Sequence, residues 1–245
     1  MEKGKTAKYF KYAIGEIVLV VIGILIALQI NNWNEDRKLR KQEINYYCQL
    51  VDNLNSDLSN IRLSQNSLDV RLEAAQRFLI NLLKKHHKKD LLIQDWLGVL
   101  RSRSFVPTRA AIEDITSSGK LEIIGNENHK NAILDYYVQQ DQALDIMKTN
   151  KNQLFDLVFE IKGFTAFGIH EVPEYSEIYS NELQKLLKSS DWQKNPNDPI
   201  YQGALDLANM SIILCAREKE VLNDIQNQAE ELIGLLEGKC QNHKN

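Results

Sequence analysis

The sequence lacks the motifs that carry the common kinds of catalysis. It contains no Gly-rich phosphate loop, no H-E-x-x-H or G-x-S-x-G pattern and no EF-hand loop. Five histidines are scattered over expected helix ends and loops, with no spacing that brings two of them together: His86, His87, His129, His170 and His243. We therefore expect no enzyme activity, no cofactor and no metal site.

Cysteine content and net charge are also low. The formal net charge of −3 gives no argument for a nucleic-acid partner. The three cysteines have no C-x-x-C spacing, and an odd, sparse set does not describe a disulfide framework. Cys48 and Cys215 fall within apolar helical patterns, so we expect both to be small core residues. The sequence leaves a bridge between these two cysteines open.

Glycine and proline are absent from residues 24–97, which favours helix because they are its main breakers. Apolar positions there step by three and four, with one polar exception at Gln65: Ile44, Tyr47, Val51, Leu54, Leu58, Ile61, Leu68, Leu72, Ala75, Leu79 and Leu82. Extrapolated backwards, the steps pass through Trp33, so we expect one continuous rod. The stretch KKHHKKD at residues 84–90 is interpreted as its cationic end, in preference to a basic patch or metal site.

The longest hydrophobic run, Ile17–Leu28, lies within the apolar stretch of residues 13–30. A membrane-spanning helix needs roughly 20 such residues. Tyr12 and Trp33 flank the stretch in the manner of interfacial aromatic belts. No small-residue cleavage site follows, and nothing downstream is apolar enough to wrap such a helix. We therefore expect a retained membrane anchor, rather than a signal peptide or a buried helix.

This anchor divides the chain into four parts. We expect a short N-terminal tail (1–12), a transmembrane helix (13–32), a helical bundle domain (33–240) and a polar tail (241–245). Lysine and arginine counts tie on the two sides of the span, so the positive-inside rule does not decide its orientation. We expect the N-terminus in the cytoplasm and the bundle outside it, because this arrangement is common for a first and only span.

One carboxylate lies inside the span. Glu16, Gly23 and Ala27 are separated by seven and four residues, which places them on one helix face. The small-xxx-small spacing of Gly23 and Ala27 lets two helices approach closely, so this face is a candidate for self-association, with the bilayer and a second helix as its partners. The alternative is that Glu16 extends to the lipid headgroups from a position about one turn inside the interface.

The remainder of the chain predicts two more long helices. One covers residues 127–161, after a turn and cap at Gly125-Asn126. The other starts with Asp198 as cap and Pro199 as first helical residue, and Gly238 and the polar residues QNHKN end it. Shorter helices are expected at 91–102, 107–118 and 176–189, with Gly119 as a left-handed cap after the second of them and with loops at 163–175 and 189–198. No strand alternation or repeat is present. We therefore expect an all-α fold, in which the transmembrane helix continues into an elongated antiparallel bundle.

The segment Pro107–Tyr137 interrupts this regular pattern with turns and small polar residues. Arg109 is a cation beside an apolar helix face and can hold a carboxylate through two parallel hydrogen bonds. Together with Glu113 and Asp114 it forms a candidate site for contact with a ligand or partner. In the alternative interpretation the segment caps the end of the bundle, and Arg109 pairs with Glu113.

The N-terminal stretch YAIGEIVLVVIGILIALQINNWNEDRK resembles the signature of a family of uncharacterised single-pass membrane proteins, common in Bacteroidota-type bacteria. ITSSGKLEII, at residues 115–124, and Tyr136-Tyr137 are similar to two further family stretches. The resemblance implies a bacterial inner-membrane protein with a helical domain of unknown function. It implies no catalytic residue, cofactor or substrate.

Two functions are compatible with this architecture. We expect an anchored helical interaction or scaffold protein, which self-associates or serves as an accessory subunit of an envelope complex. The alternative is an extracytoplasmic helical bundle that senses or binds a small molecule and signals through a partner.

Overall fold

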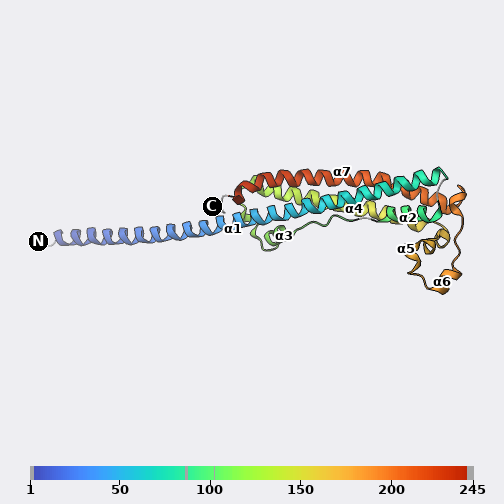
Figure 1. Ribbon diagram of the computed structural model, residues 1–245. Coiled ribbons are helices and arrows are strands. Elements are labelled where there is room, and N and C mark those ends of the chain that lie inside the picture. Colours follow the sequence, from blue (N-terminus) through green and yellow to red (C-terminus); the bar gives the residue numbers. More distant parts are fainter. Residues whose placement is uncertain (1–2, 86–87, 102, 242–245) are drawn as a thin grey trace.

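A computed structural model gives the fold of residues 3–85, 88–101 and 103–241 (Figure 1). These residues form α-helices and short 3₁₀ helices, with no strand among them. The expected all-α fold is therefore confirmed. The expectations for His86, His87 and His243, and for the polar tail from residue 242 onwards, lie outside the described residues.

Helix α1 runs unbroken from Lys3 to Leu83, which confirms the predicted continuity of the span with the first helix of the bundle. Figure 1 shows its first part as a lone rod that leaves the bundle toward the N-terminus. Every side chain from Ile14 to Gln42 is exposed. The helix ends at Leu83, directly before the stretch at 84–90 that is predicted to end it, and Lys85 takes the left-handed conformation, at φ 56°.

Two further long helices, α4 (Glu127–Glu160) and α7 (Pro199–Gln241), complete the body of the bundle (Figure 1). Helix α7 runs antiparallel to α1 and makes the most extensive pairing in the structure, while α4 packs mainly on α7. Both begin at the predicted caps, because the side-chain oxygens of Asn126 and Asp198 accept hydrogen bonds from backbone N–H groups of the first turn.

The fourth leg of the bundle is only half helical. Helix α2 (Lys89–Leu100) turns back along α1, and the chain then continues as an extended segment, residues 103–109 (Figure 1). Three α1 side chains bind the backbone of this segment in order, at Arg103, Val106 and Thr108: Ser67, Asn60 and Asp57. Ser67 and Asp57 are ten residues apart on the helix, whereas their partners Arg103 and Thr108 are only five residues apart on the extended chain. The two separations match because ten residues of helix and five of extended chain both span roughly 15 Å.

Short elements close the two ends of the bundle. They are α3 (Ala110–Ser117), η1 (Lys120–Ile123), η2 (Phe164–Phe167), η3 (Ile169–Glu171), α5 (Pro173–Ser176), α6 (Asn181–Leu186) and η4 (Trp192–Lys194). The predicted loop at 163–175 is wrong, because its aromatic residues fold it into short helices. Phe167 stacks on Trp192 at 4.9 Å between ring centroids, and its carbonyl accepts the indole N–H.

The predicted helix at 176–189 is also wrong in extent. Helix α6 begins only after Ser180, whose hydroxyl accepts a hydrogen bond from the backbone N–H of Leu183. It ends at Leu186, and the backbone is extended at Leu187. Gly119 has the predicted left-handed conformation after α3, at φ 67°.

The interior contains two apolar clusters separated by polar side chains. The first cluster lies in the half nearer the span and includes Leu54, Ile61 and Ile133. The second lies in the far half and includes Phe78 and Trp96. Buried polar residues lie between them on the three long helices: Arg71 on α1, Asn150 on α4 and Glu218 on α7.

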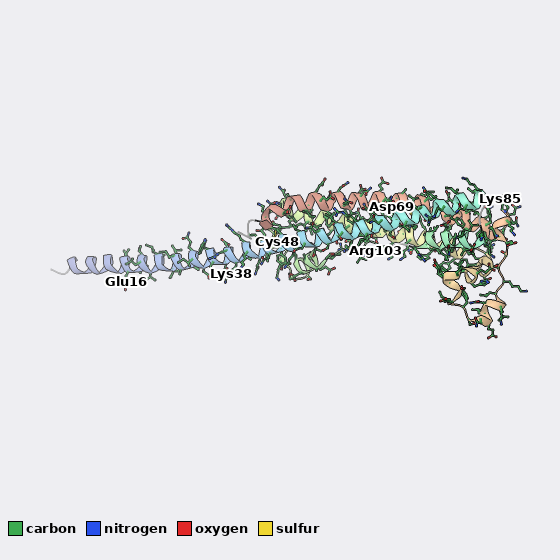
Figure 2. All side chains as sticks on the ribbon, viewed as in Figure 1. Glu16, Lys38, Cys48, Asp69, Lys85 and Arg103 are labelled. Carbon is green, nitrogen blue, oxygen red and sulfur yellow. A yellow bond between two sulfur atoms is a disulfide. The ribbon has the colours of Figure 1, made fainter. Side chains whose placement is uncertain are left out.

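A disulfide joins α1 to α7 at the end of the bundle where α1 enters it. Cys48 is bonded to Cys240, 192 residues away in sequence, at the point where α1 enters the bundle (Figure 2). The sequence predicts Cys48 as a small core residue, with a bridge to Cys215 left open; it is half-buried and bonded to Cys240 instead. The antiparallel register sets Cys48 against the last turn of α7, which passes through Gly238 and ends at Gln241, the first residue of the polar stretch. Cys215 is free and buried in mid-helix.

Candidate functional site

The predicted association face lies on the lone part of α1 (Figure 2). Glu16, Gly23 and Ala27 are all exposed, and a Cβ added at Gly23 meets no atom within 4 Å. Within the described residues, α1 is the one helix long and apolar enough to cross a membrane, and its apolar window is 0% buried. No part of the described chain covers this face.

The predicted contact site at the near end of the bundle is engaged within the chain. Arg109 pairs with Asp141 of α4 at 2.8 Å and lies over the ring of Tyr137, 5.6 Å from its centroid. Asp114 accepts a hydrogen bond from the hydroxyl of Tyr46 on α1 at 2.8 Å. These contacts tie the beginning of α3 to α4 and its end to α1.

The candidate residues of this site therefore serve different contacts. Glu113 is exposed on α3, and the structure pairs Arg109 with Asp141 in place of Glu113. The cation sits at the N-terminus of α3, from where its side chain reaches α4. This arrangement favours the interpretation of the segment as a cap over the bundle. It leaves the role of Arg109, Glu113 and Asp114 in ligand or partner contact a prediction.

This half of the bundle also contains a buried carboxylate that the apolar pattern of the sequence does not predict. Asp57 is fully buried on α1. Its carboxylate accepts the backbone N–H of Thr108 at 2.6 Å, the side-chain amide of Gln140 at 2.9 Å and the hydroxyl of Tyr136 at 3.4 Å. The carboxylate thus holds the extended segment and α4 against α1.

Burial raises the pKa of Asp57, and the hydrogen bonds from Thr108, Gln140 and Tyr136 offset part of that shift. Burial, together with the Asp57 charge, also raises the pKa of Tyr136, so this hydroxyl stays protonated as a donor. A carboxyl with a raised pKa binds its proton more tightly in the folded chain. Its contribution to stability is therefore largest at low pH and is lost as the pH rises above 3.8 through the native pKa.

We expect Asp57→Ala to lower the free energy of unfolding by about 3 kcal/mol, because it leaves the Thr108 N–H and the Tyr136 O–H without an acceptor. Asp57→Asn is expected to change it by less than about 1 kcal/mol. The Gln140 carbonyl oxygen has no partner among the described residues and can accept the new amide N–H after rotation. Urea titrations at several pH values measure both effects.

The pH series supplies the control for this prediction. Asp57→Asn must remove the part of the pH dependence that Asp57 contributes above pH 3.8. Equal losses of stability in Asp57→Ala and Asp57→Asn would contradict the proposed amide rotation.

Comparison with known proteins adds one finding. Residues 16–95 match the model of a family of unknown function (DUF6090). The match begins at Glu16 in the span and ends at Asp95 in α2, so it includes the association face and Cys48 but neither α4 nor α7. This part of the chain is similar to an uncharacterised family. No curated protein and no solved structure matches the chain.

Proposed function

We propose that this chain is a membrane-anchored helical interaction protein that self-associates through its span. The observation that carries the proposal is the unbroken helix α1, whose apolar part is exposed on all sides and whose remainder forms one leg of the bundle. Because no glycine, proline or loop separates the two parts, the span and the bundle are held in one fixed relation. A helix that dimerises in the membrane therefore also sets the distance between two bundles.

The occupant we assign to the face of Glu16, Gly23 and Ala27 is a second copy of the same span. Gly23 and Ala27 leave room for a close approach, and Glu16 in an apolar helix gains from a partner that shields it. A different membrane protein at this face would make the chain an accessory subunit of a larger envelope complex. The experiment below separates the two.

The disulfide supports a location of the bundle outside the cytoplasm. Bonds such as Cys48–Cys240 persist in oxidising compartments, of which the bacterial periplasm is one. The resemblance of the span sequence to bacterial membrane proteins supports the inner membrane as the site of the anchor. We accordingly propose that the N-terminus faces the cytoplasm and the bundle faces the periplasm.

We expect the wild-type chain to cross-link as a dimer in native membranes, and the variant Gly23→Leu/Ala27→Leu to lose most of this product because the added side chains separate the helices. Gly15→Leu is the matched control, since residue 15 lies about 100° around the helix from Glu16 and also faces open space. Quantitative cross-linking, followed by sizing in detergent, measures the effect.

A wild-type monomer, or a dimer that Gly23→Leu/Ala27→Leu leaves intact, would contradict self-association through this face. Identification of the co-purifying proteins completes the test. A stoichiometric second membrane protein that is lost from Gly23→Leu/Ala27→Leu, in the absence of a dimer, would replace self-association with the accessory-subunit function.

A second candidate function, the binding of a small molecule by the bundle, is favoured by one specific observation. A cavity of about 210 Å³ opens between α1, α4, α7 and the extended segment at residues 103–105. Its position in the middle of the bundle leaves it independent of the span.

A further inference from the structure

The cavity in the middle of the bundle exists because the fourth leg is not helical there. An α-helix with side chains is about 10 Å across, whereas an extended chain lies only about 5 Å from its neighbour. Where α2 gives way to the extended segment, the body of the bundle is therefore thinner. Figure 2 shows Arg103, at the start of this segment, on the outside of the bundle near its middle.

One part of the cavity wall is apolar. Five side chains from α1, the extended segment, α4 and α7 form it: Leu68, Phe105, Leu144, Met147 and Leu222. Leu68, Phe105 and Leu222 are buried, so they form a fixed surface for the body of a ligand. An apolar cavity of about 150 Å³ accommodates benzene. This cavity of about 210 Å³ can therefore hold a ring or short branched chain with one polar group.

Positive charge gathers around the same cavity. Arg103, Lys148 and Lys151 line it, are exposed, and make no ion pair with any described residue. Arg71 lies deeper, with 3% of its side chain exposed, and pairs with Glu218 at 3.2 Å. Four cations thus face a single carboxylate, and that carboxylate is already paired.

One buried hydroxyl beside the cavity also lacks a partner. Ser64 is 2% exposed and lies on the cavity wall, and its Oγ makes no hydrogen bond with the described residues. A hydroxyl buried without a partner costs free energy, which a ligand oxygen can recover. The cavity therefore offers a donor at its base and cations at its mouth.

We infer that this cavity binds a small organic anion, a carboxylate attached to a short apolar body. The body lies against Leu68, Phe105 and Leu222, and the carboxylate faces Arg103, Lys148 and Lys151. This inference rests on the second function proposed above. It is independent of self-association, since the cavity lies in the bundle and the association face in the span.

A lipid of the anchoring membrane is an unsuitable occupant. Roughly 45 Å of helix separates Trp33, at the end of the span, from Ser64 at the cavity. Headgroups around the span do not reach that far. The ligand is therefore expected to come from solution, and a free molecule is the appropriate probe.

The experiment is a titration of the full-length chain in detergent with benzoate, followed by calorimetry and by the thermal unfolding midpoint. Benzyl alcohol is the neutral probe of the same shape, and inorganic phosphate is the anion without an apolar body. We expect saturable binding of benzoate, a rise in the unfolding midpoint, and much weaker binding of the other two compounds.

Three exposed cations can be neutralised without disturbing the core. Arg103→Gln/Lys148→Gln/Lys151→Gln is expected to weaken benzoate binding roughly tenfold or more, because the carboxylate loses its charged partners. The control Arg62→Gln/Lys162→Gln/Lys188→Gln removes the same charge at exposed positions outside the cavity and should bind as the wild type does.

Several outcomes would overturn the inference. These are the absence of saturable benzoate binding, equal affinity for benzyl alcohol, equal affinity for phosphate, and equal weakening in the control variant. Dimer formation in the membrane is measured on the same preparations. A chain that dimerises but does not bind benzoate would contradict the ligand-binding proposal alone. A chain that binds benzoate but does not dimerise would contradict the self-association proposal alone.

Discussion

Arg71→Met is expected to lower the free energy of unfolding by about 3–5 kcal/mol, because it leaves the buried carboxylate of Glu218 without its partner. The side chains of this pair are 3% and 11% exposed, with 3.2 Å between Nη2 and Oε2. The Arg71 Nε also donates to the Sγ of Cys215 at 3.0 Å, so one side chain serves two groups of α7. Urea denaturation of the full-length chain in detergent measures the loss.

The double variant Arg71→Met/Glu218→Leu separates the cost of an unpaired charge from the contribution of the pair itself. Replacement of a buried ion pair by apolar residues of similar size is often neutral or stabilising. We therefore expect the double variant to regain most of the stability that Arg71→Met loses. A double variant as unstable as the single one would show that the arginine acts through packing, and not through Glu218.

The second large effect is expected from the disulfide. Cys48→Ser/Cys240→Ser should lower the free energy of unfolding by about 2–5 kcal/mol, because the bond closes a very long loop and so restricts the unfolded chain. The loop spans 192 residues. Thermal unfolding of wild type and variant, each with and without reductant, measures the effect. The same midpoint for oxidised and reduced wild-type chains would contradict it.

The disulfide also determines how the topology can be tested. An impermeant thiol reagent is expected to label Cys48 and Cys240 in intact spheroplasts only after reduction, whereas the buried Cys215 stays unlabelled in the folded chain. Labelling that appears only after the membrane is permeabilised would place the bundle in the cytoplasm and contradict the proposed orientation. Labelling in intact spheroplasts without reductant would contradict the disulfide itself.

Local signals were sufficient to predict the long helices. The absence of glycine and proline predicts the long rod, Asn126 predicts the beginning of α4, and the pair Asp198-Pro199 predicts the beginning of α7. Each of these signals is local to its own helix, so it requires no knowledge of the tertiary structure. The bond between Cys48 and Cys240 could not be predicted in this way, because it depends on the antiparallel register of α1 and α7.

The polar residues of the interior were not predicted, although the sequence contains a signal for them. Asp57, Ser64 and Arg71 follow one another at intervals of seven, so they lie on one face of α1, and all three are buried. A pattern of apolar residues at intervals of three and four does not include these polar positions. The partners of Asp57 and Arg71 come from the extended segment, α4 and α7, and only the tertiary fold brings those elements to α1.

The pairing of α1 with α7 has a consequence for synthesis of the protein. The first and last helices of the chain form its most extensive contact, so α1 leaves the ribosome long before its partner. At ~5–20 residues per second, the chain between Leu83 and Pro199 takes roughly 6–23 s to make. During that time the apolar side of α1 lacks its main cover. A chaperone that binds apolar nascent helices therefore has this interval in which to act on the chain.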